Sequence, residues 1–414
     1  MRKAIYRNLL LCGLAILSAC GGGSRDKLVV VGMDGLDPLE LNQLIALGYL
    51  PTFERVINEG VYTDLHVDRF PMFSPVLWTT IATGYGEDGH GVGNWLKDDG
   101  SIYQANDLGA ERFWEAADRD GRPTFQAGYL MTTPPSMENG ISVSQTFSVT
   151  GSAREADPSM LVYPTEYFAD FTALIPDPVW VKDVPLVGSS LDAAGLSNFL
   201  GADEAHLRIF ERIWDIIRPE VSVLYFSGAD KLGHLMDARS EAGREFVMER
   251  SHGWTDEKRA LIVRQYYTYL DSALARIVGL LDPSKTTLVI CSDHGWQLEG
   301  RAEWDTRHRD PGLLIGWGKR AKAGASPESP PRQIDLGRTL FGLADQAAAK
   351  DMPGRDLSDL FQLPKIRPRQ SRLISNELRN ANTVDNLDEA LQLEQLRLLG
   401  YIDDKGQNIP DQQN

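Results

Sequence analysis

The fold class of this chain is indicated by the stretch LVVVGMDG, residues 28–35. Its first four residues are apolar and mostly β-branched, which is typical of a strand buried on both faces of a parallel sheet. The run ends in Asp34 and Gly35, a carboxylate followed by a residue that permits a tight turn. We therefore expect a buried strand that presents an acidic side chain at its carboxyl end.

The same arrangement recurs twice along the chain. VSVLYF at 221–226 precedes Asp230, and TTLVIC at 286–291 precedes Asp293. A helical pattern comes before each of these two strands, at residues 203–218 and 258–281. A third helical pattern, at 38–58, follows the strand at 28–31. Helices that alternate with apolar strands indicate an α/β protein with a central, mostly parallel sheet and helices on its faces. Its functional site is expected at the carboxyl edge of the sheet.

The length and composition set the domain organisation. A chain of 414 residues with 42% hydrophobic content can bury one large core. We expect one main domain over 28–363, with an inserted lid at about 100–200, where Pro, Thr, Ser and aromatic residues interrupt the periodic pattern. Residues 364–414 are expected to form a C-terminal extension with an amphipathic helix at 387–401.

The N-terminus has the form of a bacterial export signal. Basic residues precede an apolar run at 9–17, which is too short to span a bilayer comfortably. LSAC at 17–20 resembles the lipobox of lipoproteins, in which the cysteine is lipidated. We expect a signal peptide at 1–19, a lipidated tether at 20–27 and a chain that is anchored through Cys20 on the periplasmic or cell-surface side of a membrane.

The charge of the chain restricts its partners. It carries 58 acidic and 42 basic side chains, and the signal peptide removes basic residues only. This acidic excess repels nucleic acid and anionic lipid surfaces, so membrane contact would depend on the lipid anchor. An anionic substrate would need a strong local cation, which a bound metal supplies.

Aspartate and histidine residues with the spacing of metal ligands follow the predicted strands. Asp230 and His234 are four apart, which places both on one side of a helical turn. Asp293 and His294 directly follow a strand. Taken singly, each is as well explained by a helix cap, a turn or a solvated side chain, but their shared setting favours a metal site. The candidate ligands are Asp34, Asp230, His234, Asp293, His294 and His308.

A candidate nucleophile stands at the start of another helical pattern. Ser74 precedes Pro75 and has the form of an N-cap residue with proline at the first helical position. Its hydroxyl would then lie at the positive end of the helix dipole. A purely structural cap is the alternative interpretation.

The order and spacing of these candidates resemble the type I phosphodiesterase and nucleotide pyrophosphatase family of the alkaline phosphatase superfamily, in its bacterial phosphohydrolase or phosphomutase-like branch. The likeness covers nearly all of the mature chain, including 71–93 and 398–401. It implies an alkaline phosphatase-like fold and a site with two zinc ions. Ser74, nine residues before a Thr-Gly turn, matches the family's nucleophile, which is also a metal ligand. One zinc would be held by Asp230, His234 and His308, and the other by Asp34, Asp293 and His294.

The resemblance implies a hydrolase that cleaves phosphate esters of a small phosphorylated substrate, with phosphodiester or pyrophosphate bonds favoured, through a phosphoseryl intermediate on Ser74. Sulfatases carry Pro and Arg two and four residues after their nucleophile, where this chain has Val76 and Trp78. A phosphomonoesterase, a phospho-group transferase and a non-catalytic surface binding lipoprotein remain alternatives. The sequence assigns no residue to substrate binding.

The lipid anchor can be tested directly. We expect Cys20→Ser to give unprocessed or soluble protein, because the substitution removes the thiol that would carry the lipid. Membrane fractionation and detergent partition of the full-length chain provide the measurement. A variant that partitions into detergent as the unmodified chain does would contradict the interpretation of residues 17–20.

Overall fold

The computed structural model describes residues 25–147, 157–176, 193–236, 256–296 and 308–374, with the single residues 393, 396, 402, 406 and 407. The expected signal peptide at 1–19, Cys20 and most of the expected helix at 387–401 lie outside the described residues. Within the part of the chain that is described, no helix combines the length and apolar character needed to cross a membrane.

The core of the molecule is an eight-stranded sheet with the strand order β2-β10-β7-β1-β6-β3-β4-β5. Its strands are β1 Lys27–Met33, β2 Val61–Leu65, β3 Thr124–Ala127, β4 Ile141–Val143, β5 Val162–Tyr163, β6 Val221–Phe226, β7 Thr286–Cys291 and β10 Gly312–Gly318. The five strands from β7 to β4 run parallel to their neighbours, and β10, β2 and β5 pair antiparallel at the two sides. The predicted mostly parallel α/β sheet is therefore confirmed.

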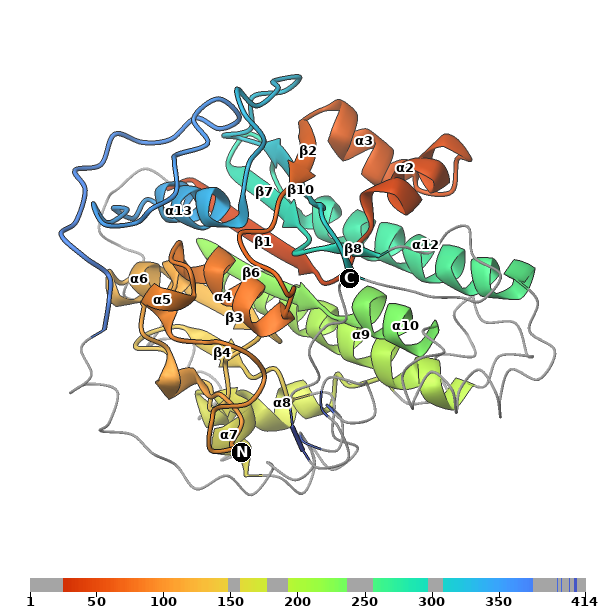
Figure 1. Ribbon diagram of the computed structural model, residues 1–414, viewed down its shortest axis with the longest axis horizontal. Helices are drawn as coiled ribbons and strands as arrows, with labels where there is room; N and C mark the ends of the chain where they lie inside the picture. The colour runs from red at the N-terminus through yellow and green to blue at the C-terminus, as the bar shows by residue number, and fades with distance from the viewer. Residues whose placement is uncertain are drawn as a thin grey trace, which may run out of the picture.

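Helices cover both faces of this sheet (Figure 1). They are α2 Pro38–Ala46, α3 Pro51–Asn58, α4 Ser74–Thr83, α5 Glu87–His90, α6 Phe113–Arg119, α7 Pro158–Leu161, α8 Phe168–Thr172, α9 Ala193–Ile216, α10 Gly228–Met236, α12 Asp256–Leu280 and α13 Gln333–Leu343, with the 3₁₀ turns η1 Ala105–Asp107 and η2 Thr165–Tyr167.

Alternation along β1 divides the core into two layers. Val29 and Val31 face one side, where they pack with α2, α3, α9 and α12. Leu28 and Val30 face the other side, where they pack with α4, α6 and α13. Because side chains of a strand alternate between faces, a strand covered on both sides is apolar throughout, as residues 28–31 are.

The predicted elements next to the site agree closely with the observed ones. The expected strands at 221–226 and 286–291 coincide with β6 and β7, and the helical patterns at 203–218 and 258–281 fall within or beside α9 and α12. The pattern at 38–58 is two helices, because Gly48 adopts a positive φ of 77° and Pro51 begins α3.

The expected lid at about 100–200 needs correction where the structure describes it. Strands β3, β4 and β5 come from this range and extend the main sheet beyond β6. They have only four, three and two residues, which is too short to give a recognisable alternating pattern. The described segments 124–147 and 157–163 therefore contribute strands to the core sheet, whereas 148–156 and 177–192 lie outside the described residues.

Candidate active site

The three central strands of the sheet deliver most of the predicted ligands to one edge. Asp34 follows β1, and Asp293 and His294 follow β7, which is its parallel neighbour. β6 pairs with β1 on the other side and leads into α10, which carries Asp230 and His234. Because parallel strands have their carboxyl ends at the same edge, these side chains lie close together although nearly 260 residues separate the first from the last.

A first group of possible metal ligands consists of Asp230, His234 and His308. Asp230 Oδ1 lies 3.3 Å from His308 Nε2 and 3.6 Å from His234 Nε2. The two imidazole nitrogens are 3.3 Å apart. His308 reaches the group from the short hairpin of β8 Gly295–Trp296 and β9 His308–Arg309.

A second group consists of Asp34, Asp230 and His294. His294 Nε2 lies 3.5 Å from Asp34 Oδ1 and 3.6 Å from Asp230 Oδ1. Asp293 Oδ2 is also 3.6 Å from this nitrogen. The structure thus brings all six candidate ligands into one cluster, in which Asp230 belongs to both groups and Asp293 lies beside the second.

The carboxylates of this cluster have strongly shifted affinities for protons. Burial, together with the charge of Asp230, raises the pKa of Asp34 to about 7. Burial and the charge of Asp34 raise the pKa of Asp293 well above its ordinary value. Burial also acts to raise the pKa of Asp230, but the neighbouring imidazoles outweigh it and hold that pKa below its ordinary value. Repulsion between like charges that are removed from water explains the raised pKa values of Asp34 and Asp293, and a bound cation would relieve this repulsion.

Two of the imidazoles are oriented as metal ligands are. His308 Nδ1 lies 3.1 Å from the carbonyl oxygen of Met72, and His294 Nδ1 lies 3.2 Å from that of Gly295. A carbonyl oxygen only accepts hydrogen bonds, so each Nδ1 donates and each Nε2 carries the lone pair that points into the cluster. Burial also lowers the pKa of His294 to about 3, which keeps this ring neutral.

Several buried atoms here lack the partner that a metal would provide. Among the described residues, Asp34 Oδ1, Asp293 Oδ2, His294 Nε2 and Ser74 Oγ make no hydrogen bond. Buried polar atoms are rarely left in this state, and each case calls for a bound ligand or a chemical role. Carboxylate and imidazole donors suit zinc, so the residues present fit a metal centre.

Ser74 lies at the start of α4, but not in the predicted position. Phe73 is the N-cap, Ser74 is the first helical residue and Pro75 the second, and the helix end has no side-chain cap. The prediction that Ser74 is itself the N-cap residue is therefore wrong by one position. The hydroxyl is fully buried at the positive end of the helix dipole, and Met72, two residues earlier, accepts from His308.

Sequence reasoning missed the residues that orient the ligands. Tyr225 donates its hydroxyl hydrogen to Asp34 Oδ2, and Gly35 N donates to Asp293 Oδ1 at 3.3 Å. The ring of Trp296 packs edge-on against His234 and His308, with centroids 4.9 and 4.7 Å away. In the sequence, Tyr225 is one of six residues in an apolar strand, so nothing in the pattern distinguishes it.

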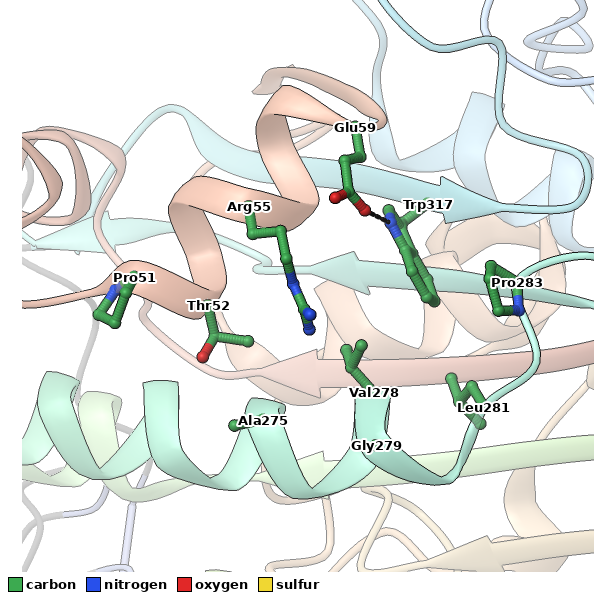
Figure 2. A pocket seen from close by; sticks show the side chains of 10 residues that line it. All are labelled: Pro51, Thr52, Arg55, Glu59, Ala275, Val278, Gly279, Leu281, Pro283 and Trp317. Carbon is green, nitrogen blue, oxygen red and sulfur yellow. Dashed lines mark hydrogen bonds between the residues drawn. The ribbon is translucent and has the colours of Figure 1, made fainter.

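A groove of about 700 Å³ lies apart from this cluster, between α3 and α12. Figure 2 shows Arg55 of α3 and Glu59, the residue that follows this helix, above Val278 of α12, with the Trp317 indole beside them. Glu59 Oε2 accepts from Trp317 Nε1 at 2.9 Å. None of the candidate ligands lines the groove, so we do not assign it to the active site.

The fold and the cluster define a class of protein: an α/β protein with a buried serine at the start of α4 and with buried carboxylate and imidazole groups at the sheet edge that could hold a metal. Residues 28–392 match the family model of the type I phosphodiesterase / nucleotide pyrophosphatase family, and the chain belongs to this family. The family takes its name from enzymes that cleave phosphodiester and nucleotide pyrophosphate bonds.

Solved structures support the fold. The alkaline phosphatase PafA is similar with 10% identity and a TM-score of 0.55, over 83% of this chain and 100% of that chain. A putative sulfatase from Bacteroides thetaiotaomicron VPI-5482 is similar with 12% identity and a TM-score of 0.52, over 81% of this chain and 74% of that chain.

Phosphonoacetate hydrolase from Sinorhizobium meliloti 1021, in complex with phosphonoformate, is 16% identical with a TM-score of 0.46, and 69% of this chain is covered. The chain spans 59% of the length of that hydrolase. A comparison with curated proteins gives no significant match.

The shifted pKa of Asp34 predicts how the stability of the metal-free protein depends on pH. The pKa of Asp34 in the folded protein, about 7, exceeds its value in the unfolded chain. Protonated Asp34 therefore contributes fully to the free energy of unfolding below about pH 4, and this contribution is lost as the pH rises through 7. The free energy of unfolding should fall over this range, by an amount on the order of a few kcal/mol.

Asp34→Asn should flatten the dependence, because the amide has no proton to lose. Thermal unfolding in the presence of a chelator, from pH 4 to pH 8, provides the measurement, with Asp64→Asn on the exposed side of β2 as the control. Equal pH dependence in Asp34→Asn and the unsubstituted protein would count against the assigned environment of Asp34.

Proposed function

We propose that the chain is a metal-dependent phosphohydrolase that cleaves phosphodiester or pyrophosphate bonds, with Ser74 as the nucleophile. The observation that carries this proposal is the buried Ser74 Oγ, which has no hydrogen-bond partner among the described residues and lies two residues after Met72, whose carbonyl oxygen accepts from the candidate donor His308. The family match supports the preference for diesters or pyrophosphates.

The donors divide between two cations, for which zinc is the expected identity. Asp230, His234 and His308 would hold one, and Asp34, Asp293 and His294 the other. Asp230 belongs to both groups of possible ligands, and Asp293 Oδ2 lies 3.6 Å from His294 Nε2, so the carboxylates lie close enough together to serve two neighbouring cations. When bound, such cations neutralise charge on the phosphoryl oxygens and lower the pKa of a nearby hydroxyl.

The remaining chemistry belongs to the chain itself. Ser74 Oγ attacks phosphorus, the bond to the ester oxygen breaks, and the leaving group departs as an alcohol or phosphate after it gains a proton. Water then attacks the phosphoseryl group, the bond to Oγ breaks and Ser74 regains its proton. The first turn of α4 favours the anionic phosphoryl group through its dipole. Tyr225 keeps Asp34 in one orientation throughout.

The proposal includes export and lipid anchoring through Cys20, which would place the active site outside the cytoplasm. Within this setting, the same nucleophile could serve a phosphomonoesterase or a phospho-group transferase. A panel of aryl phosphodiesters, aryl phosphomonoesters and sulfate esters, with zinc added, distinguishes a phosphodiesterase from a phosphomonoesterase. We expect the diester to be hydrolysed fastest, and turnover of the sulfate ester alone would contradict the proposal.

Ser74→Ala is the sharpest variant for this proposal. It removes the attacking oxygen but none of the six aspartate and histidine donors, so it should retain bound metal and lose most turnover. The loss should reach several orders of magnitude, because covalent catalysis depends on the attacking atom. Ser74→Thr should keep more activity, since it keeps a hydroxyl. The measurements are steady-state kinetics and elemental analysis on the same preparations.

Ser144→Ala is the matched control, because Ser144 is equally buried but bonds to Thr146, away from the donors. It should retain turnover. Near-normal turnover in Ser74→Ala would show that water or another hydroxyl is the nucleophile.

A further inference from the structure

Asp37 is a buried carboxylate that belongs to neither group of donors, yet it contacts three of the segments that carry them. Its side chain is 2% exposed. It follows Asp34 by three residues and begins α2, where Oδ1 accepts from the backbone N–H groups of Leu39 and Glu40, each at 2.9 Å. This oxygen therefore acts as an ordinary helix cap.

The second oxygen of Asp37 has a different role. Oδ2 accepts from the backbone N–H of Trp296 at 2.9 Å and from the Arg309 guanidinium. Trp296 stands two residues after His294, and Arg309 directly follows His308. The Asp37 carboxylate thus joins the turn after Asp34 to both strands of the hairpin, of which β8 directly follows His294 and β9 contains His308.

This connection supplements the short backbone pairing of the hairpin. β8 and β9 have two residues each, and a ladder of that length is weak on its own. A charge-assisted hydrogen bond inside a buried site is stronger than a neutral one and fixes the direction of the guanidinium. Gly295 makes the close approach possible, since a Cβ there would lie 2.4 Å from Asp37 Oδ2.

The indole of Trp296 transmits this position to the imidazoles. Its ring packs edge-on against His234 and His308, as described above, and its centroid lies 6.0 Å from that of His294. Gly35 and Gly233 leave room for the ring, because a Cβ on either would lie 2.4 Å or less from an indole atom. A shift of Trp296 would therefore displace imidazoles from both groups of donors.

We propose that Asp37 is a positioning residue of the metal centre: through Trp296 and Arg309 it fixes the imidazoles of His294, His308 and His234 in the geometry that binds the cations. This inference rests on the proposed metal site. Asp37 orients the ligands, whereas Asp34 and the other donors bind the cations.

Asp37→Asn separates this role from folding. Asparagine is as good an N-cap residue as aspartate, so the oxygen that caps α2 can be kept, while the amide cannot pair with Arg309. We expect the zinc affinity of the full-length protein to fall about 10- to 100-fold, as is usual when a residue that orients metal ligands is lost. Competition with a chromophoric chelator measures this affinity without reference to turnover.

Asp271→Asn is the matched control. Asp271 is also a buried carboxylate that caps a helix, since it accepts from the N–H groups of Thr52 and Phe53 at the start of α3. Its side-chain hydrogen bonds go to α3 and not to the candidate metal ligands, so the Asp271→Asn protein should bind zinc as tightly as the unsubstituted protein. Thermal unfolding of each metal-free variant shows how much stability the substitution itself removes.

A double-mutant cycle with Arg309→Gln identifies the route. If Asp37 acts through Arg309, the two substitutions together should weaken zinc binding by much less than the product of their separate effects. Wild-type affinity in Asp37→Asn, or equal losses in Asp37→Asn and Asp271→Asn, would overturn the positioning role. An unsubstituted protein that binds no zinc would instead overturn the proposed metal site, and the two failures are therefore distinguishable.

Discussion

The active site depends on one electrostatic constraint: three carboxylates, those of Asp34, Asp230 and Asp293, are buried together at one edge of the sheet. Removing like charges from water is unfavourable, and the raised pKa values of Asp34 and Asp293 express that cost. Imidazoles hold Asp230 in its charged form. Bound cations would relieve the remaining repulsion, so the same arrangement that is unfavourable in the metal-free chain creates affinity for metal. An acidic protein could bind an anionic phosphate ester by this means, because the local cations outweigh its overall charge.

The architecture of the sheet makes this concentration of charge possible. β7, β1 and β6 are adjacent and parallel, so the residues that follow them meet at one edge while the strands themselves are buried on both faces. The supporting groups lie around that edge. Carbonyl oxygens fix the imidazole tautomers, Tyr225 fixes Asp34, and Asp37 joins the first turn to the histidine hairpin. The donors are thus held by bonds that are present before any cation binds, which reduces the reorganisation that binding requires.

Much of this could be predicted from the sequence, because the features that carry it are local. Apolar runs predicted β1, β6 and β7, and the Asp and His residues just beyond them predicted the candidate donors, which the structure brings together. The remainder depends on contacts between distant segments. The place of Asp230 between the two groups, the hydroxyl of Tyr225 on Asp34 and the packing of Trp296 on the imidazoles follow from the fold alone. Strands β3 to β5 are too short to show a period, and the one-residue error at Ser74 reflects how weakly a Ser-Pro pair fixes the first residue of a helix.

The number and position of the bound metal ions are the most direct test of the proposed active site. Anomalous diffraction at the zinc absorption edge, from crystals of the full-length protein grown with zinc, locates them without reference to catalysis. We expect two anomalous peaks in each chain, one among Asp230, His234 and His308 and the other among Asp34, Asp293 and His294. A single peak at full loading, or peaks that lie away from these side chains, would contradict the proposed active site.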